Sequence, residues 1–470
     1  MSYICSIFND VLGPVMRGPS SSHTAGSHRI GRILRDLVGA TPDHARFEFH
    51  PGGSLATTYQ TQGSDIGLAA GLLDIEMTDS RMPDSLKLAK ESGLELEFVI
   101  TEYPATHPNT YRCRITLGEQ VVTATALSTG GGMMVFTEIN GRQVQYLGDH
   151  LLEVESMGVK RIINPVMPVE SWSGKPLPFT NAAELLRFKD LSVRSAAELA
   201  REYESARSGI PANHLDAMML DLIRIWREAI ATGLRGTTYA NRLIGSQSPG
   251  FEAARKSNKL IEAGPLNRMI QYSTAIMETK SSMGVVIAAP TAGAAGGLPG
   301  CLIGMADHAG MGDDDLLKGF WSAGLVGLFI AMDATFAAEV AGCQAETGAG
   351  ASMGAAGLVE MMGGNAWQAL GAASMALQNV LGLICDPVAN RVEIPCLGRN
   401  AQATANAVTS ANMALGGIDP VIPLNEAIKT MLEVGKAMPH TLRCTALGGL
   451  SVTPTALALE EELNRKLKQL

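Results

Sequence analysis

The sequence has no surplus of positive charge. Its 37 lysines and arginines are outnumbered by 46 aspartates and glutamates, which gives a formal net charge of −9 at pH 7. Nucleic acids and anionic membranes attract proteins that carry basic patches or stripes. We therefore expect no nucleic acid and no membrane as a partner, and a small molecule instead.

Targeting signals and long apolar segments are also missing. The N-terminal segment has no basic region followed by a long apolar core, so we expect no secretion signal. The most apolar later run, Gly319 to Met332, lies between Lys318 and Asp333 and falls short of the ~20 residues that a bilayer requires. We predict that this run is a buried helix of a cytoplasmic protein.

Cysteine is scarce, with 7 among 470 residues. A small, odd number excludes a disulfide scaffold and fits a reducing cytoplasm. Cys343, Cys385 and Cys396 lie among small residues and prolines. Because no histidine lies at a matching distance, three thiolates suit an iron–sulfur centre better than a tetrahedral zinc, which needs a fourth protein ligand. Three ordinary buried thiols are the alternative, and the spacing leaves both interpretations open.

Hydroxyl groups gather before the first predicted helix. The segment Ser20-Ser21-Ser22-His23-Thr24 leads into an amphipathic helical pattern from Arg29 to Leu34. Hydroxyls and backbone N–H groups at a helix start can bind an anion, although a single serine there is usually a plain N-cap. We predict a pocket for a carboxylate or another anion in this segment.

Two glycine-rich segments interrupt the predicted elements. Leu127 to Gly132 ends a strand pattern and is either an amide nest for an anion or a flexible turn. Ala289 to Gly300 is not a Walker loop, because no Gly-Lys-Ser/Thr closes it.

The pattern of the chain changes about one third of the way along. Strand patterns occur at 46–50, 95–101, 111–116 and 121–125, with the last two forming a hairpin. A proline-rich stretch without periodicity follows, and helical patterns rich in alanine, glycine and methionine dominate from Asn181 onward. We therefore expect an α+β N-terminal domain over residues 1–164, a linker over 165–180 and an all-α catalytic domain over 181–470.

Short motifs of unusual composition are spread over nearly the whole chain. They are Gly18-Pro-Ser-Ser-Ser-His-Thr-Ala-Gly26, Ser128-Thr-Gly-Gly-Gly132, Ala289-Pro-Thr-Ala-Gly293, Gly342-Cys-Gln-Ala-Glu346, Cys385-Asp-Pro-Val-Ala389, Ile394-Pro-Cys396 with Arg399-Asn400, and Thr445-Ala-Leu-Gly-Gly-Leu450. Together they resemble the motifs of the bacterial iron–sulfur-dependent L-serine dehydratases of the single-chain type.

The resemblance implies a [4Fe-4S] cluster on Cys343, Cys385 and Cys396, with one open iron that takes the substrate hydroxyl. It also implies a homodimer and an N-terminal domain similar to the allosteric substrate-binding module of phosphoglycerate dehydrogenases. The chemistry requires a group that takes the α-proton and donors that hold the substrate carboxylate. His23 and Lys280 are the candidate catalytic residues. The expected substrate contacts are Ser20, Ser21, Ser22, Thr24, Gln62, Ser128, Gly131, Thr291 and Asn400.

This chain departs from the family pattern at several positions. Gln62 takes the place of a histidine that is the family's leading candidate base, and Lys280 stands where an asparagine is usual. Lys280 could act as a base, bind an additional substrate carboxylate, or be a solvated residue at a helix end. Cys444 stands where glutamate is common, and we expect a buried thiol there instead of an iron ligand. The chain ends at Leu470 without the terminal cysteine that some members use as a displaceable fourth ligand.

We expect the protein to convert L-serine to pyruvate and ammonia by β-elimination of water, assisted by a Lewis-acidic iron. A related [4Fe-4S] hydro-lyase that acts on a different β-hydroxy acid is the first alternative. A pyridoxal phosphate enzyme with a Schiff base on Lys280 is the second, and an iron–sulfur sensor is the third.

Overall fold

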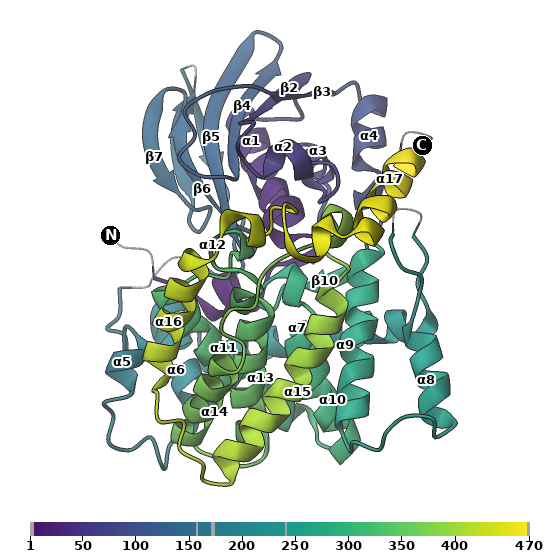
Figure 1. Cartoon of the computed structure of the whole chain (residues 1–470). Coiled ribbons are helices and arrows are strands. Elements are labelled where there is room, and N and C mark those ends of the chain that lie inside the picture. Colours follow the sequence, from purple (N-terminus) through teal and green to yellow (C-terminus); the bar gives the residue numbers. More distant parts are fainter. Residues whose placement is uncertain (1–3, 157, 171–173, 240–241, 468–470) are drawn as a thin grey trace. The chain divides into compact units, whose positions relative to one another are not determined.

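The computed structural model describes residues 4–156, 158–170, 174–239 and 242–467 (Figure 1). The chain forms two compact units, one of residues 14–171 and one that joins residues 1–13 to residues 172–470. We call them the sheet unit and the helical unit.

The N-terminal segment belongs to the helical unit, whereas the sequence predicted an α+β domain that begins at residue 1. Its short turn η1 (Ile7–Val11) is buried. The Ile7 backbone N–H donates a 2.8 Å hydrogen bond to the buried carboxylate of Glu204, and Val11 lies against Gly327 of a buried helix. The partners of this segment are about two hundred or more residues away, so no local pattern could reveal them.

The sheet unit is built on a six-stranded sheet with the strand order β3-β2-β4-β5-β6-β7. Strands β2 and β3 are parallel, and the other neighbours are antiparallel. The strands are β2 (His44–Phe49), β3 (Glu95–Ile100), β4 (Thr110–Leu117), β5 (Gln120–Gly130), β6 (Met133–Ile139) and β7 (Arg142–Tyr146).

All four strands that the sequence predicted are found, with ends that differ by a few residues. The predicted hairpin is β4–β5, in which Leu117 pairs with Gln120. The unit also contains β1 (Val15–Arg17) and a separate hairpin of β8 (Leu152–Ser156) and β9 (Val159–Ile163).

Helices cover one face of this sheet. Helix α1 (Gly26–Val38) packs against α3 (Ser64–Leu72) and against the central strands β4 and β5. Tyr111 of β4 points toward both helices, because its hydroxyl lies 2.9 Å from Ser27 Oγ of α1 and 3.2 Å from Ser64 Oγ of α3. Two shorter helices are α2 (Leu55–Thr58) and α4 (Ser85–Glu91).

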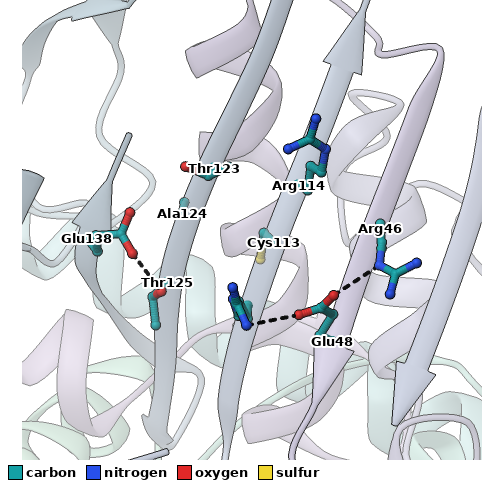
Figure 2. Close-up of a pocket in the computed structure, with 9 residues that line it drawn as sticks. Arg46, Glu48, Cys113, Arg114, Thr123, Ala124, Thr125 and Glu138 are labelled. Atoms are coloured by element: carbon teal, nitrogen blue, oxygen red, sulfur yellow. Dashed lines mark hydrogen bonds and ion pairs between the residues drawn. The ribbon is translucent and has the colours of Figure 1, made fainter. Parts of the chain in front are cut away.

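The opposite face of the sheet carries charges. Successive side chains of a strand point to opposite faces, so Arg112 and Arg114 point away from the helices that Tyr111 meets. Figure 2 shows Arg114 together with Arg46 and Glu48, which line a hollow of about 240 Å³. Glu48 accepts a 3.0 Å hydrogen bond from Arg46 Nε and pairs with Arg112 Nη1 at 3.4 Å.

The helical unit is a bundle around one completely buried helix. Every residue of α13 (Thr347–Met361) is buried, and α10, α11, α14 and α15 pack around it (Figure 1). The helices of the unit are α5 (Ala182–Leu185), α6 (Ala196–Ser208), α7 (Ala212–Arg235), α8 (Ser248–Lys256), α9 (Leu266–Ser281), α10 (Gly297–Ala309), α11 (Asp313–Asp333), α12 (Ala338–Ala341), α13, α14 (Ala366–Gln378), α15 (Cys396–Leu415), α16 (Leu424–Ala437) and α17 (Pro454–Leu467), with the short strand β10 (Val285–Ile287). Alanine, glycine and serine on α13 let the surrounding helices approach closely.

Helix α11 contains the apolar run that the sequence predicted to be a buried helix. The helix has 21 residues, which is longer than the run itself, and is the one helix among the described residues that is long and apolar enough to cross a membrane. Of its most apolar window, 72% is buried inside the structure, so most of its apolar surface is covered by protein.

Candidate active site

The predicted anion segment of the sheet unit folds into one compact turn, which we call the hydroxyl turn (residues 20–24). It overlaps η2 (Ser21–Ala25), and Ser20 caps the start of η2 by accepting a hydrogen bond from the His23 backbone N–H. His23 is buried and lies among hydroxyl groups. Its Nδ1 is 3.0 Å from Ser20 Oγ and 3.2 Å from Ser22 Oγ, and its Nε2 is 2.8 Å from Thr58 Oγ1.

These contacts determine where the proton of His23 lies. Thr58 Oγ1 donates its only hydrogen to the Ser54 carbonyl at 2.6 Å, so it can only accept from His23 Nε2. The imidazole is therefore the Nε2–H tautomer, and Nδ1 accepts from the serine hydroxyls. Burial lowers the pKa of His23 to about 4, so the ring is neutral at pH 7. A neutral imidazole with this pKa is a weak base.

Further predicted contact residues of the sheet unit adjoin the hydroxyl turn. Thr24 Oγ1 donates a 2.9 Å hydrogen bond to the Gln62 carbonyl, and Ser128 Oγ donates one of 2.6 Å to the Ser22 carbonyl. Gly131 lies beside Ser128 in a run of three glycines with positive φ angles. The fold thus brings Ser22 and Ser128 together, although about a hundred positions separate them in the sequence, and it places Gln62 against Thr24.

Asp65 is an ionisable group in this region that the sequence analysis did not select. It lies in the first turn of α3, and burial raises its pKa to about 7. A carboxyl group with this pKa can exchange a proton near neutral pH. In the sequence, the signal that could have revealed it was a charged residue that ends the motif Gly63-Ser64-Asp65 directly before an apolar stretch.

In the helical unit, Cys343 and Cys385 share one buried cluster. Gly342, before Cys343, has a φ of +72°, and a side chain there would come within 2.8 Å of the Leu383 carbonyl oxygen. Glycine thus allows the segment of Cys343 to lie directly against the segment that leads to Cys385. Cys444 packs against the same cluster, and its backbone N–H donates to the Cys385 carbonyl at 2.9 Å.

The pKa values of the cysteine thiols report their surroundings. Burial, followed by the charge of Glu346, raises the pKa of Cys343 to about 11. Burial and the neighbouring Cys343 raise the pKa of Cys396. A hydrogen bond with Cys444 and burial raise the pKa of Cys385. The thiols of Cys343, Cys385 and Cys396 are buried near one another, and their raised pKa values favour the protonated form at neutral pH.

These thiols match an iron–sulfur cluster in donor chemistry, because such clusters are held by cysteine thiolates in buried surroundings. Within the described parts of the chain, no three His, Cys, Asp or Glu side chains already meet in an arrangement that could hold a metal ion. Binding would also displace the thiol protons, as is general for cysteine ligands.

Glu346 is the second ionisable group that the sequence analysis did not select. Thr291 Oγ1 donates a 2.6 Å hydrogen bond to its carboxylate, and burial raises its pKa to about 7. The absence of a side chain at Gly293 makes room for Glu346, because a Cβ there would be 3.0 Å from both carboxylate oxygens. Glu346 closes the Cys343 motif in the sequence, and this position was the signal that could have revealed it.

The side chain of Asn400, which the sequence predicted to be a substrate contact, forms its hydrogen bonds with backbone groups of the protein. Its Oδ1 accepts hydrogen bonds from the N–H groups of Gly296 and Gly297 at 3.1 and 2.8 Å. Its Nδ2 donates to the carbonyls of Gly293 and Cys396 at 2.7 and 2.8 Å. All the hydrogen-bonding positions of the amide are occupied, so Asn400 joins the glycine-rich loop to the first turn of α15, which begins at Cys396.

Lys280 is completely buried in the last turn of α9. Its Nζ donates a hydrogen bond to the Val392 carbonyl. Burial lowers its pKa to about 8, and Cys396 and Glu393 are the main neighbours that oppose this shift. Lys280 is therefore not a solvated residue at a helix end, and it lies near the cysteine that begins α15.

The comparisons with known proteins agree with these motifs. The profile of the family described as serine dehydratase alpha chain matches residues 181–451. A probable L-serine dehydratase alpha chain of Bacillus subtilis is 37% identical over 241 residues, which cover 51% of this chain and 80% of that protein. The L-serine dehydratase of Streptomyces coelicolor and L-serine dehydratase 1 of Escherichia coli are each 30% identical, and each alignment covers 93% of this chain and 96% of the relative. The chain therefore belongs to the serine dehydratase family, of which it has the single-chain form.

Proposed function

We propose that this protein is an iron–sulfur-dependent L-serine dehydratase. It eliminates water from L-serine, and the resulting aminoacrylate hydrolyses to pyruvate and ammonia. The observation that supports this proposal best is the buried group of three cysteines beside Glu346 in the helical unit. This group combines thiol ligands with an acid whose pKa lies near neutrality, as a hydro-lyase requires.

Cys343, Cys385 and Cys396 are the residues that would hold a [4Fe-4S] cluster. When bound, such a cluster supplies a Lewis-acidic iron that assists the departure of hydroxide, a poor leaving group. Their burial limits exchange with solvent and keeps the local dielectric low.

Glu346 is the proton-transfer group that the geometry favours. With a pKa of about 7, its carboxylate can take a proton and its acid form can return one without a large energetic cost. The hydrogen bond from Thr291 fixes the orientation of the carboxyl group, which gives Thr291 a positioning role. Gln62 has no basic group, and His23 is the weaker base because of its low pKa.

The hydroxyl turn is the proposed site for the substrate carboxylate. Ser20 and Ser22 share His23 Nδ1 as an acceptor, and a hydroxyl group that rotates away from Nδ1 can donate to an anion instead. Ser22→Ala should therefore raise KM for L-serine more than it lowers kcat.

The test is anaerobic reconstitution with iron and sulfide, followed by measurement of bound iron and of pyruvate formed from L-serine. We expect about four iron atoms per chain and pyruvate formation in the reconstituted protein. Cys343→Ser should lose both iron and activity. Cys301→Ser is the matched control, because Cys301 is equally buried in the helical unit and burial alone shifts its pKa. Equal iron content in the two variants would contradict the assignment of the ligands.

We also propose that the protein is a cytoplasmic homodimer that degrades amino acids. The family resemblance supports this assembly. Sedimentation of the reconstituted enzyme tests it, and a mass equal to one chain of 49.5 kDa would contradict it.

A further inference from the structure

Three buried cations gather around one carboxylate in the helical unit. Arg242 and Arg391 each form an ion pair with Glu393, at 3.8 and 3.6 Å, and their side chains are only 4% and 5% exposed. Lys280 is fully buried nearby, since Glu393 and Arg391 are both among the charges that act on it. Two carboxylates, Glu393 and Glu346, of which Glu346 also acts on Lys280, therefore face three positive charges in this buried region.

Glu393 cannot neutralise this group alone. Its carboxylate already accepts hydrogen bonds from the backbone N–H groups of Leu243 and Ile244, at distances of 3.2 to 3.4 Å. These dipoles compete with the cations for the same negative charge. Burying uncompensated charge is unfavourable, so such an arrangement indicates a place for an additional anion.

Arg242 has donor capacity that the described protein does not use. Its Nη1 donates to Thr237 Oγ1 and to Ser282 Oγ, at 2.8 and 2.9 Å. Its Nη2 is buried and has no hydrogen-bond partner among the residues that the structure describes. A buried guanidinium nitrogen without an acceptor is rare, because protein interiors satisfy nearly all such groups.

Lys280 has unused donor capacity as well. An ammonium group has three hydrogens, and within the described ranges Nζ donates to a single acceptor, the Val392 carbonyl. Ser282, which binds Arg242, follows Lys280 by two residues at the end of α9. Arg242 and Lys280 thus both lie at the same end of α9, and Cys396 is a further neighbour of Lys280.

We propose that Arg242 and Lys280 bind a second anionic group of the substrate, a carboxylate, so that the enzyme prefers β-hydroxy amino acids that carry an acidic side chain over L-serine. This inference rests on the proposed dehydratase function and names the substrate class of the same site. A planar guanidinium and an ammonium together suit a carboxylate, which accepts several charge-assisted hydrogen bonds.

The reaction on such a substrate balances in the same way as on L-serine. For 3-hydroxyaspartate, the α-proton and the β-hydroxyl leave as water and an enamine of a dicarboxylic acid forms. Water then hydrolyses the enamine to oxaloacetate and ammonia. The second carboxylate takes no part in the bonds that break, so it contributes only to binding and orientation.

The first test uses the reconstituted holoenzyme without any mutation. L-Aspartate and L-alanine both lack the β-hydroxyl group, so they act as inhibitors of L-serine turnover and not as substrates. We expect L-aspartate to inhibit at a concentration at least tenfold lower than L-alanine. We also expect kcat/KM for one diastereomer of L-3-hydroxyaspartate to exceed that for L-serine at least tenfold. Equal inhibition by the two amino acids would overturn the proposal.

The second test assigns the effect to Arg242. Arg242→Gln should reduce the preference for L-aspartate over L-alanine at least tenfold and leave the inhibition by L-alanine within twofold of the wild type. Arg235→Gln is the matched control, because Arg235 lies in the same unit and its Nη2 donates an exposed hydrogen bond to Thr232 Oγ1. Calorimetric binding of L-aspartate to the holoenzyme gives the same comparison without turnover. If Arg242→Gln lowers the iron content but keeps the preference for L-aspartate over L-alanine, the cations stabilise the cluster and do not bind a substrate carboxylate, and the proposal is wrong.

The outcomes separate this inference from the proposed function. Turnover of L-serine with no preference for acidic substrates contradicts the inference and leaves the dehydratase function intact. Arg242-dependent binding of L-aspartate, without turnover of L-serine or 3-hydroxyaspartate, supports the anion site and contradicts the dehydratase function.

Discussion

Replacing Asn400 with alanine tests whether this residue supports the site or touches the substrate. The side chain is completely buried and makes four hydrogen bonds. In Asn400→Ala, the N–H groups of Gly296 and Gly297 lose their acceptor inside the protein. Each buried donor left without a partner costs about 1–3 kcal/mol, so the two together cost about 2–6 kcal/mol. That is a large part of the ~5–15 kcal/mol that stabilises a typical domain.

The assay is urea unfolding of the anaerobic protein, followed by tryptophan fluorescence. Trp226 and Trp321 are buried in the helical unit, so their emission reports its unfolding. Asn267→Ala is the matched control, because Asn267 lies in the same unit and donates one exposed hydrogen bond to the Ile261 carbonyl. We expect a change below about 1 kcal/mol for the control and a much lower urea midpoint for Asn400→Ala.

A conservative variant sharpens the same test. Asn400→Asp keeps an oxygen for the two glycine N–H groups but places its other oxygen against the carbonyls of Gly293 and Cys396. The carboxylate is repelled there, whereas the protonated acid can donate to one carbonyl. The stability of Asn400→Asp relative to the wild type should therefore rise as the pH falls. If Asn400→Ala unfolds at the wild-type urea concentration but loses affinity for L-serine, the side chain is a substrate contact and our reasoning is refuted.

Three further changes have defined outcomes. Glu346→Gln keeps the hydrogen bond from Thr291 but cannot transfer a proton, so kcat should fall by about 100-fold or more; an unchanged kcat would exclude Glu346 as the acid–base group. Burial lowers the pKa of His23 to about 4, so as the pH falls this imidazole is protonated in the unfolded chain before it is protonated in the folded protein. The free energy of unfolding should therefore decrease by up to about 3 kcal/mol as the pH falls from 6.5 toward 4. His23→Gln should flatten this dependence in urea titrations at several pH values, and an unaltered slope would argue against a neutral buried imidazole. Cys444→Ser should keep the full iron content, whereas loss of iron would make Cys444 a ligand.

The sequence predicted the fold class, because the strand and helix patterns are local. The alternation of residues 111–116 and 121–125 predicted the hairpin that β4 and β5 form. The apolar run near residue 325 predicted the buried helix α11. Helix α13 was not predicted from periodicity, since a helix buried on all sides has no polar face. The position of the N-terminal segment was also missed, because its partners lie far away along the chain.

What the sequence determined by itself was the family. Rare residue types in short motifs are visible without any structure, and the motifs around Cys343, Cys385 and Cys396 are of this kind. The tertiary structure alone decided the protonation and the partners of the ionisable groups. Burial gives Glu346 a pKa near 7 and gives His23 a low one, and neither burial is a property of the local sequence. The Arg242 nitrogen that has no partner among the described residues likewise became apparent only when three separate segments were brought into contact, because hydrogen bonding and desolvation depend on neighbours in space.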